Sequence, residues 1–150
     1  MLSDIAAIAL HGPDDLYVLD ADYRKIAVFD SAGNLRRVIL GGSGEGPGEF
    51  HNPGSLSVAL DGRIFVLDES QRVSVFSPEG EFMRSFLPSD GPFKTVVIGA
   101  DGRLWLGRRI ASSNYAAVVY DTLGRPGDQA FPVNPNCGHS WVKPRPGRFG

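Results

Sequence analysis

A repeat is the feature of this sequence that most limits its fold. Short apolar segments recur in order along the chain, each followed by similar turn residues. The matching pairs are Leu16–Asp20 with Ile64–Asp68, Lys25–Asp30 with Arg72–Ser77 and, in a weaker third copy, Asp61–Val66 with Asp101–Leu106. The spacings lie between 40 and 48 residues. Self-similarity at such a period indicates tandem copies of one supersecondary unit, and here it predicts three copies.

Each copy divides into four short apolar runs separated by turn residues. In the second copy we expect strands over 55–60, 63–68, 72–77 and 81–87. Asp-Gly pairs at 61–62 and 101–102 stand between the first and second runs, where they favour a hairpin turn. Gly33, Gly80 and Gly124 stand between the third and fourth runs, where a left-handed backbone is needed. A unit of four strands in succession, repeated every 40 to 48 residues, is typical of a β-propeller blade.

Composition narrows both the fold class and the function class. The 19 Gly and 11 Pro are spread along the chain, and no window has a helical period, so we expect an all-β protein. A net charge of −2 argues against a dedicated nucleic-acid binder. One cysteine, Cys137, permits no disulfide within the chain. The first residues contain neither an export signal nor a segment long enough to span a membrane.

The middle copy resembles one NHL-type repeat. The resemblance rests on the string GEGPGEF at 44–50, Asn52-Pro53, the DGRIFVLD string at 61–68, the RVSVF string at 72–76 and Gly80. The first copy is similar over 16–40, and the third only over 93–124. This resemblance implies a six-bladed β-propeller, whose inner strands line a central channel. Relatives are often exported or surface-attached bacterial proteins; others are ligase subunits that bind RNA or protein, and a few are lyases or hydrolases with a metal in the channel.

The blade count departs from that family. We expect blades over about 1–43, 44–90 and 91–132, then a poorly ordered Pro/Gly/Arg-rich tail over 133–150. Propellers close with about four to eight blades, so three blades form only half of a six-bladed ring. An open wedge exposes two apolar blade faces. The chain could be a fragment, could pair with a second copy as a homodimer, or could be completed by a partner chain.

The polar candidates for a site are few. His51 and Asn52 precede the inner strand of the second blade, so we expect them at the mouth of the channel as a binding site. His11, His51 and His139 occupy non-equivalent positions, and Gly54 stands where the lyase relatives carry a histidine, so we predict no metal and no cofactor. Cys137 has no adjacent base except His139 two residues away, which argues against nucleophilic catalysis.

Other repeated residues are predicted to have structural roles. Asp20 and Asp68 end equivalent strands and are expected to accept backbone N–H bonds in turns. Tyr17, Phe65 and Trp105 share one slot and are expected in the core between blades. The Gly-rich segment 41–48 lacks the Lys-Ser/Thr pair and helix of a phosphate loop, so it is expected to be a connector.

These observations favour a non-catalytic binding or scaffolding module rather than an enzyme, because no acid/base pair or metal set is assembled. The alternative is part of a propeller lyase or hydrolase whose channel site needs further blades. The expected partner is a protein or small ligand, with no nucleic acid and no membrane span. Localisation stays open, although family relatives are often extracytoplasmic.

Overall fold

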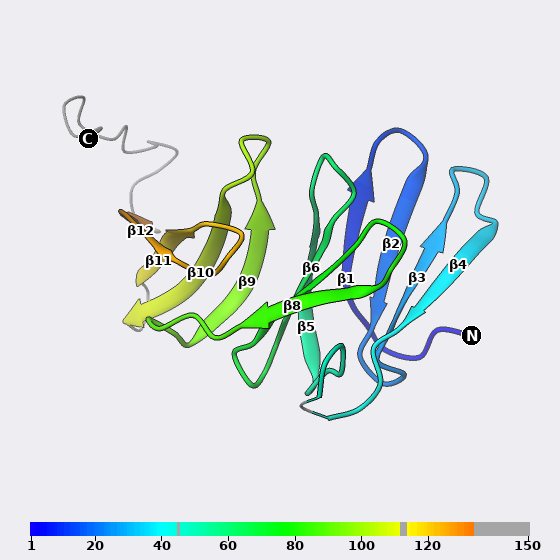
Figure 1. The fold of residues 1–150 in the computed structure, drawn as a ribbon, viewed down its shortest axis with the longest axis horizontal. Coiled ribbons are helices and arrows are strands. Elements are labelled where there is room, and N and C mark those ends of the chain that lie inside the picture. The colour runs from blue at the N-terminus through cyan, green and yellow to red at the C-terminus, as the bar shows by residue number, and fades with distance from the viewer. Residues whose placement is uncertain (45, 112–113, 134–150) are drawn as a thin grey trace.

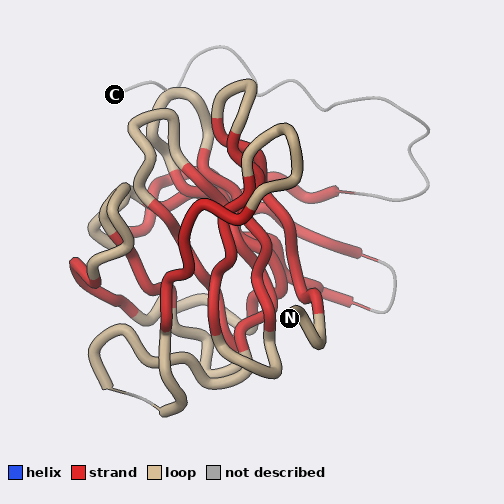
Figure 2. Tube along the Cα trace, turned by 90° about the vertical axis from the view of Figure 1, so that its right-hand side faces the viewer, coloured by secondary structure: helices blue, strands red, loops and turns tan. Residues whose placement is uncertain are grey.

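The computed structural model describes residues 1–44, 46–111 and 114–133, and strands joined by turns make up this part of the chain (Figure 2). Blade 1 consists of β1 (Ile5–His11), β2 (Asp15–Asp20), β3 (Lys25–Phe29) and β4 (Leu35–Leu40). Blade 2 consists of β5 (Pro53–Val58), β6 (Ile64–Asp68), β7 (Val73–Phe76) and β8 (Phe82–Phe86). Blade 3 consists of β9 (Phe93–Ile98), β10 (Leu104–Ala111), β11 (Asn114–Tyr120) and β12 (Pro126–Val133).

Each blade is a four-stranded antiparallel sheet whose strands pair in chain order. The three sheets stand side by side, with blade 2 between blade 1 at the right and blade 3 at the left (Figure 1). The expected all-β fold with three four-stranded units is therefore confirmed. The first strand of blade 2 begins at Pro53 rather than 55, because Pro53 already pairs with Asp68 across the bulge before Ser55.

The third turn of every blade has the same construction. Asp30, Ser77 and Asp121 each accept two amide N–H bonds from residues two and four positions later. The glycine three residues on, at 33, 80 and 124, has φ of 85°, 92° and 84°. A side chain is strained at such a φ, which explains why the turn glycine recurs. The short oxygen-bearing residue at the first position satisfies turn donors that the sheet leaves unpaired.

Two hydrophobic cores hold the blades together, and the middle blade contributes one of its two faces to each core. We call the face that a blade turns toward the preceding blade its leading face, and the opposite one its trailing face. In blades 1 and 3 the faces are named by the equivalent register positions. In blade 2 the leading face contains Leu56, Ile64, Val66 and Phe76. Its trailing face contains Phe65, Leu67, Val73 and Val75. Strand pleating produces this division, because successive side chains point to opposite sides of a sheet.

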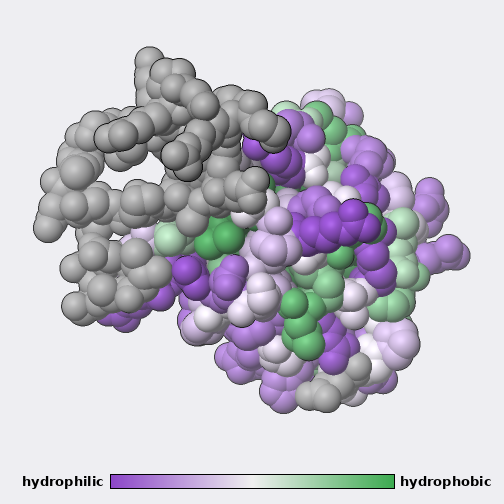
Figure 3. All heavy atoms as spheres, turned by 60° about the vertical axis from the view of Figure 1, so that its left-hand side comes forward, coloured by the Kyte–Doolittle hydropathy of each residue, from purple (hydrophilic) through white to green (hydrophobic). Residues whose placement is uncertain are grey.

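The first core lies between the trailing face of blade 1 and the leading face of blade 2, with Phe50 of the connector at its edge. The second lies between the trailing face of blade 2 and the leading face of blade 3. On the surface turned forward in Figure 3, hydrophobic residues form small separate areas among hydrophilic ones. The described part of the chain contains no helix long and apolar enough to cross a membrane.

Candidate functional site

A buried carboxylate fastens the entry of the inner strand in blades 1 and 2. Asp20 and Asp68 are 0% and 4% exposed and occupy the same register position at the end of the second strand. Asp20 accepts N–H bonds from Ser3 at 2.8 Å and from Tyr23 at 3.1 Å. Each carboxylate therefore joins the segment before the inner strand to the turn after the second strand. The predicted structural role of these aspartates is confirmed.

Burial alone would raise the pKa of Asp20, but its hydrogen bonds outweigh burial. The amide N–H groups of Ser3, Tyr23 and Asp4, with the charge of Lys25, hold the pKa of this carboxyl below its usual value. A carboxylate that accepts several backbone donors stays ionised at the cost of some desolvation. The anchor is thus an anion at neutral pH.

His51 and Asn52 lie directly above this anchor in blade 2. The amide of His51 donates to Asp68 Oδ2 at 3.0 Å, and the amide of Glu69 contacts the carbonyls of His51 and Asn52 at 3.0 and 3.2 Å. Asn52 has a φ of 54°, which Asn tolerates better than most residues. The backbone is thereby fixed while both side chains are exposed. These are the properties that a preorganised contact residue needs.

Asp68 also supports the neighbouring turn. Its Oδ1 accepts from the Ser70 hydroxyl at 2.6 Å and from the Arg72 amide at 3.3 Å. The next residue along this turn, Gln71, bonds to the backbone at the start of blade 3: its Nε2 donates to the Phe93 carbonyl at 3.2 Å, and its Oε1 accepts from the Phe93 amide at 2.5 Å. The end of the molecule that carries His51 is therefore tied across two blades.

Blade 3 departs from this pattern at the same register position. Arg108 pairs with Phe93, as Asp68 pairs with Pro53, so an arginine replaces the carboxylate. The Arg108 guanidinium donates to the carbonyl of Asp90, and the Tyr120 hydroxyl donates to the Asp90 carboxylate at 3.4 Å. The segment before β9 is therefore fixed by the Arg108 guanidinium, which donates to a backbone carbonyl. In blades 1 and 2 a carboxylate that accepts from backbone amides has this role.

The Gly-rich segment between blades 1 and 2 is a connector, as expected. Glu49 Oε2 accepts the amide of Gly46 at 2.8 Å, so its carboxylate occupies the concave side of the turn. Phe50 is 1% exposed and packs edge-on against Phe76 at 5.6 Å between ring centroids. An acidic side chain in the turn disfavours a phosphate ligand there.

The repeated aromatic slot splits between two situations. Tyr17 and Phe65 are buried at 2% and 0% exposure within the two cores between blades, as expected. Trp105, at the same position of blade 3, lies on its trailing face and is half-buried. The difference follows from packing, because the described residues place no blade against that face.

The remaining candidates do not come together. His11 ends β1, and its Nε2 lies 3.0 Å from the Leu60 carbonyl, far along the sheet from His51. Cys137, His139 and the predicted tail lie outside the described residues. Within the described residues, no three His, Cys, Asp or Glu side chains are grouped closely enough to hold a metal ion.

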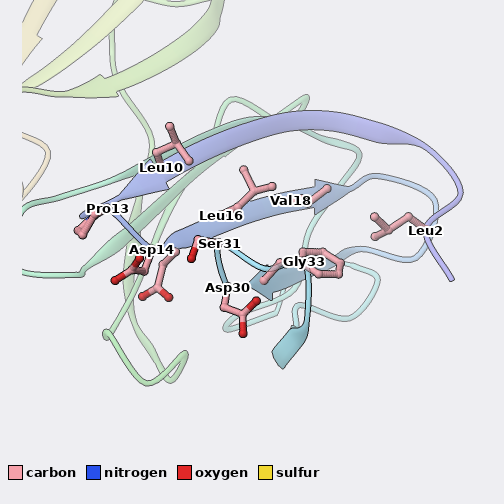
Figure 4. A pocket seen from close by; sticks show the side chains of 11 residues that line it. Leu2, Leu10, Pro13, Asp14, Leu16, Val18, Asp30, Ser31 and Gly33 are labelled. Atoms are coloured by element: carbon pink, nitrogen blue, oxygen red, sulfur yellow. The ribbon is translucent and has the colours of Figure 1, made fainter.

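Sequence reasoning missed a hollow on the leading face of blade 1. It has a volume of about 480 Å³ and includes Leu10, Leu16, Val18 and Gly33 (Figure 4). No sequence signal could have found it, because the registers align Leu10, Leu16 and Val18 with apolar positions that also occur in blades 2 and 3.

Comparison with known proteins identifies the fold family. Residues 1–142 match a family described as a 6-bladed beta-propeller, DUF5128. The chain belongs to this propeller family. No match was found among curated protein sequences.

Two solved structures resemble the propeller chain. One is the crystal structure of a Bacteroides fragilis protein named as exported, with a TM-score of 0.67 and 22% identity over 84% of this chain and 37% of that chain. The other is the structure of U3-55K, with a TM-score of 0.64 and 12% identity over 85% of this chain and 39% of that chain. At these identities the likeness concerns the fold. The propeller chain spans less than two fifths of either relative.

Proposed function

We propose that the chain is a non-catalytic binding or scaffolding module of a six-bladed, NHL-type β-propeller. The carrying observation is the pair of exposed side chains at 51 and 52 on a backbone fixed by buried Asp68. The NHL assignment is supported by the string over 44–50, whose Glu49 and Phe50 organise the connector that leads into this pair. Rigid scaffolds with polar loop residues at one end suit recognition of a partner.

The counterparts of this pair support a shared recognition surface. Ser3 and Asp4 precede β1 as His51 and Asn52 precede β5, and all four residues are exposed. The Ser3 hydroxyl donates to Asp22 at 2.6 Å, so this end of blade 1 is also rich in hydrogen-bonding groups. A surface of donors and acceptors around a channel mouth fits a polar peptide segment or a small polar ligand.

The proposal is tested by panning a random peptide library on the purified protein and on the double variant His51→Ala/Asn52→Ala. Selected peptides should lose at least about tenfold in affinity for the double variant, which corresponds to 1.4 kcal/mol. Glu79→Ala/Glu81→Ala is the matched control, because these exposed residues lie in the turn between β7 and β8 at the opposite end of the same blade. Equal affinity for all three proteins would contradict the proposed site.

The rival proposal is part of a propeller lyase or hydrolase. It requires ligands from blades beyond the three described here, as the metal site of such relatives would. Metal analysis of the purified protein separates the two functions. Stoichiometric, tightly held zinc or calcium would overturn the non-catalytic module, whereas metal-free protein with unchanged peptide binding supports it.

A further inference from the structure

The leading face of blade 1 has the apolar residues of an interface between blades, but none of the described blades packs against it. Ile8, Leu56 and Val96 hold one register position, since they pair with Val18, Val66 and Leu106. Leu56 is 7% and Val96 is 1% exposed, whereas Ile8 is 64% exposed. The same apolar position is therefore buried in blades 2 and 3 and exposed to solvent only in blade 1. Removing such a side chain from water is favourable, so this face is expected to bind an apolar partner surface.

The turn glycine shows what kind of residue the cover supplies. A Cβ at Gly80 would lie 2.6 Å from Ile39 of blade 1, and a Cβ at Gly124 would lie 2.4 Å from Phe86 of blade 2. In both interfaces, a large apolar residue on the outer strand of the preceding blade occupies the space above the glycine. Nothing lies within 4 Å of a Cβ at Gly33. Gly33 borders the hollow of Figure 4, so a large apolar residue of a covering blade would lie in this hollow.

The trailing face of blade 3 has the matching pattern. Trp105, Ala117 and Val119 occupy the positions of Phe65, Val73 and Val75, which pack against the following blade. The outer strand also continues the series, because Phe131 pairs with Ala117 as Phe86 pairs with Val73 and Ile39 with Ile26. Phe131 thus holds the register position that contacts the next turn glycine in both existing interfaces.

We propose that the leading face of blade 1 binds the trailing face of blade 3 of a second copy of this chain, and that two such interfaces close a six-bladed ring. The three blades of the described residues, taken from each of two copies, make six, the number that characterises the family. In this ring the turn of Gly33 in one copy lies against β12 of the other at the register position of residue 131. The proposal concerns assembly and does not depend on the binding function proposed above.

The groups for one polar contact between blades are also present on the two faces of the proposed interface. The hydroxyl of Ser55 on β5 accepts the amide of Val96 on β9 at 3.0 Å. In the ring the same relation brings the amide of Ile8 to Thr95, which follows Ser55 in register. Thr95 keeps a hydroxyl at this position, so the acceptor is retained across the new interface.

Sedimentation equilibrium of the 150-residue protein tests the ring. The expected particle has twice the 16.1 kDa chain mass and does not grow further with concentration. A monomer, or an open series of larger species, would overturn the proposal, because a head-to-tail contact that fails to close forms chains.

Matched variants test the interface itself. Ile8→Lys should raise the dimer dissociation constant at least about tenfold, because it places a charge in the interface. Leu60→Lys is the control, since Leu60 is 76% exposed in a turn of the middle blade and should change the constant by less than about twofold. Equal effects of the two lysines would contradict this face.

A second pair guards against a folding defect. Gly33→Ala and Gly102→Ala introduce the same change at φ of 85° and 77°, with nothing within 4 Å of either Cβ. Gly62, the counterpart of Gly102, lies toward blade 1, so Gly102 belongs to the side of blade 3 that is already covered. Only Gly33→Ala should weaken the dimer. Loss of the dimer in neither or in both would overturn the docking proposal.

Discussion

Single buried residues determine how the strands of this propeller enter the sheets. Asp20 and Asp68 look alike in the sequence because each follows four apolar residues of a second strand, and their role as acceptors of backbone N–H bonds could be predicted from the repeat. Arg108 could not be predicted in this role. It follows Gly107 in a weak copy; the pairing with Phe93 shows that it stands at the position of the carboxylate, and no repeated residue signals its bond to the Asp90 carbonyl.

Removing the Asp68 carboxylate should destabilise the fold strongly. Asp68→Ala leaves the amides of His51 and Arg72 and the hydroxyl of Ser70 without their acceptor, with an expected loss of about 3 kcal/mol in the free energy of unfolding. Asp61→Ala, at an exposed ion pair with Arg63, should cost less than about 1 kcal/mol. Urea unfolding measures both losses. Equal losses would show that the buried Asp68 carboxylate stabilises the fold no more than the exposed Asp61 does.

The Asp20 carboxylate should make stability depend on acid. Its pKa is lowered in the folded state, so its contribution is present above the unfolded pKa of about 3.9 and is lost as the pH falls through the folded value. Asp20→Asn should therefore be less stable than the wild type near neutral pH, and the difference should shrink as the pH falls. Urea midpoints from about pH 6 to about pH 3 measure it. Parallel curves for the two proteins would contradict the anchor.

At the scale of elements, the turns before the fourth strands add contacts between blades to those of the strands. The sequence predicted a left-handed glycine before each fourth strand, and the structure adds that the glycine also makes room for a neighbour. That second role depends on which side of the sheet the turn leans toward. A repeat pattern contains the turn chemistry of each blade but not the identity of the side chain from the adjacent blade.

Gly80→Ala should separate these two roles. Its Cβ meets Ile39 at 2.6 Å in addition to a φ of 92°, so a loss of about 2–4 kcal/mol in unfolding free energy is expected. Gly102→Ala has the positive φ of 77° alone, and about 1 kcal/mol is expected. Thermal and urea unfolding of both variants provide the comparison. Equal destabilisation would mean that Ile39 moves aside without cost.

Strand boundaries were predicted closely where alternation and Asp-Gly turns agree, as in β6 and β7. Beginnings of inner strands were less accessible, because Pro53 and Gly54 are not typical strand residues and join β5 only by pairing with β6 across a bulge. The hollow beside Gly33 was missed for a related reason. It is lined by apolar residues of ordinary core type, and the exposure of Leu10 shows that no described blade covers them.

At the scale of the whole molecule, the three blades are equivalent in construction and unequal in surroundings. Blade 2 is covered on both faces, whereas the described residues place no blade against the leading face of blade 1 or the trailing face of blade 3. A ring of six removes both exposed faces at once, which is how propellers protect apolar blade surfaces. The family description specifies six blades, and the strand registers around Ile8 and Phe131 support our proposal that a second copy supplies the other three.

Small-angle X-ray scattering of the purified 150-residue protein tests the ring most directly. Two chains closed into one compact particle of 300 residues should have a radius of gyration of about 19 Å, with a mass of two chains from the forward scattering. A compact single chain should instead measure about 15 Å. For the wild type we expect the larger value, independent of concentration, and for Ile8→Lys a shift toward the smaller value. A concentration-independent particle with the mass of one chain would contradict it.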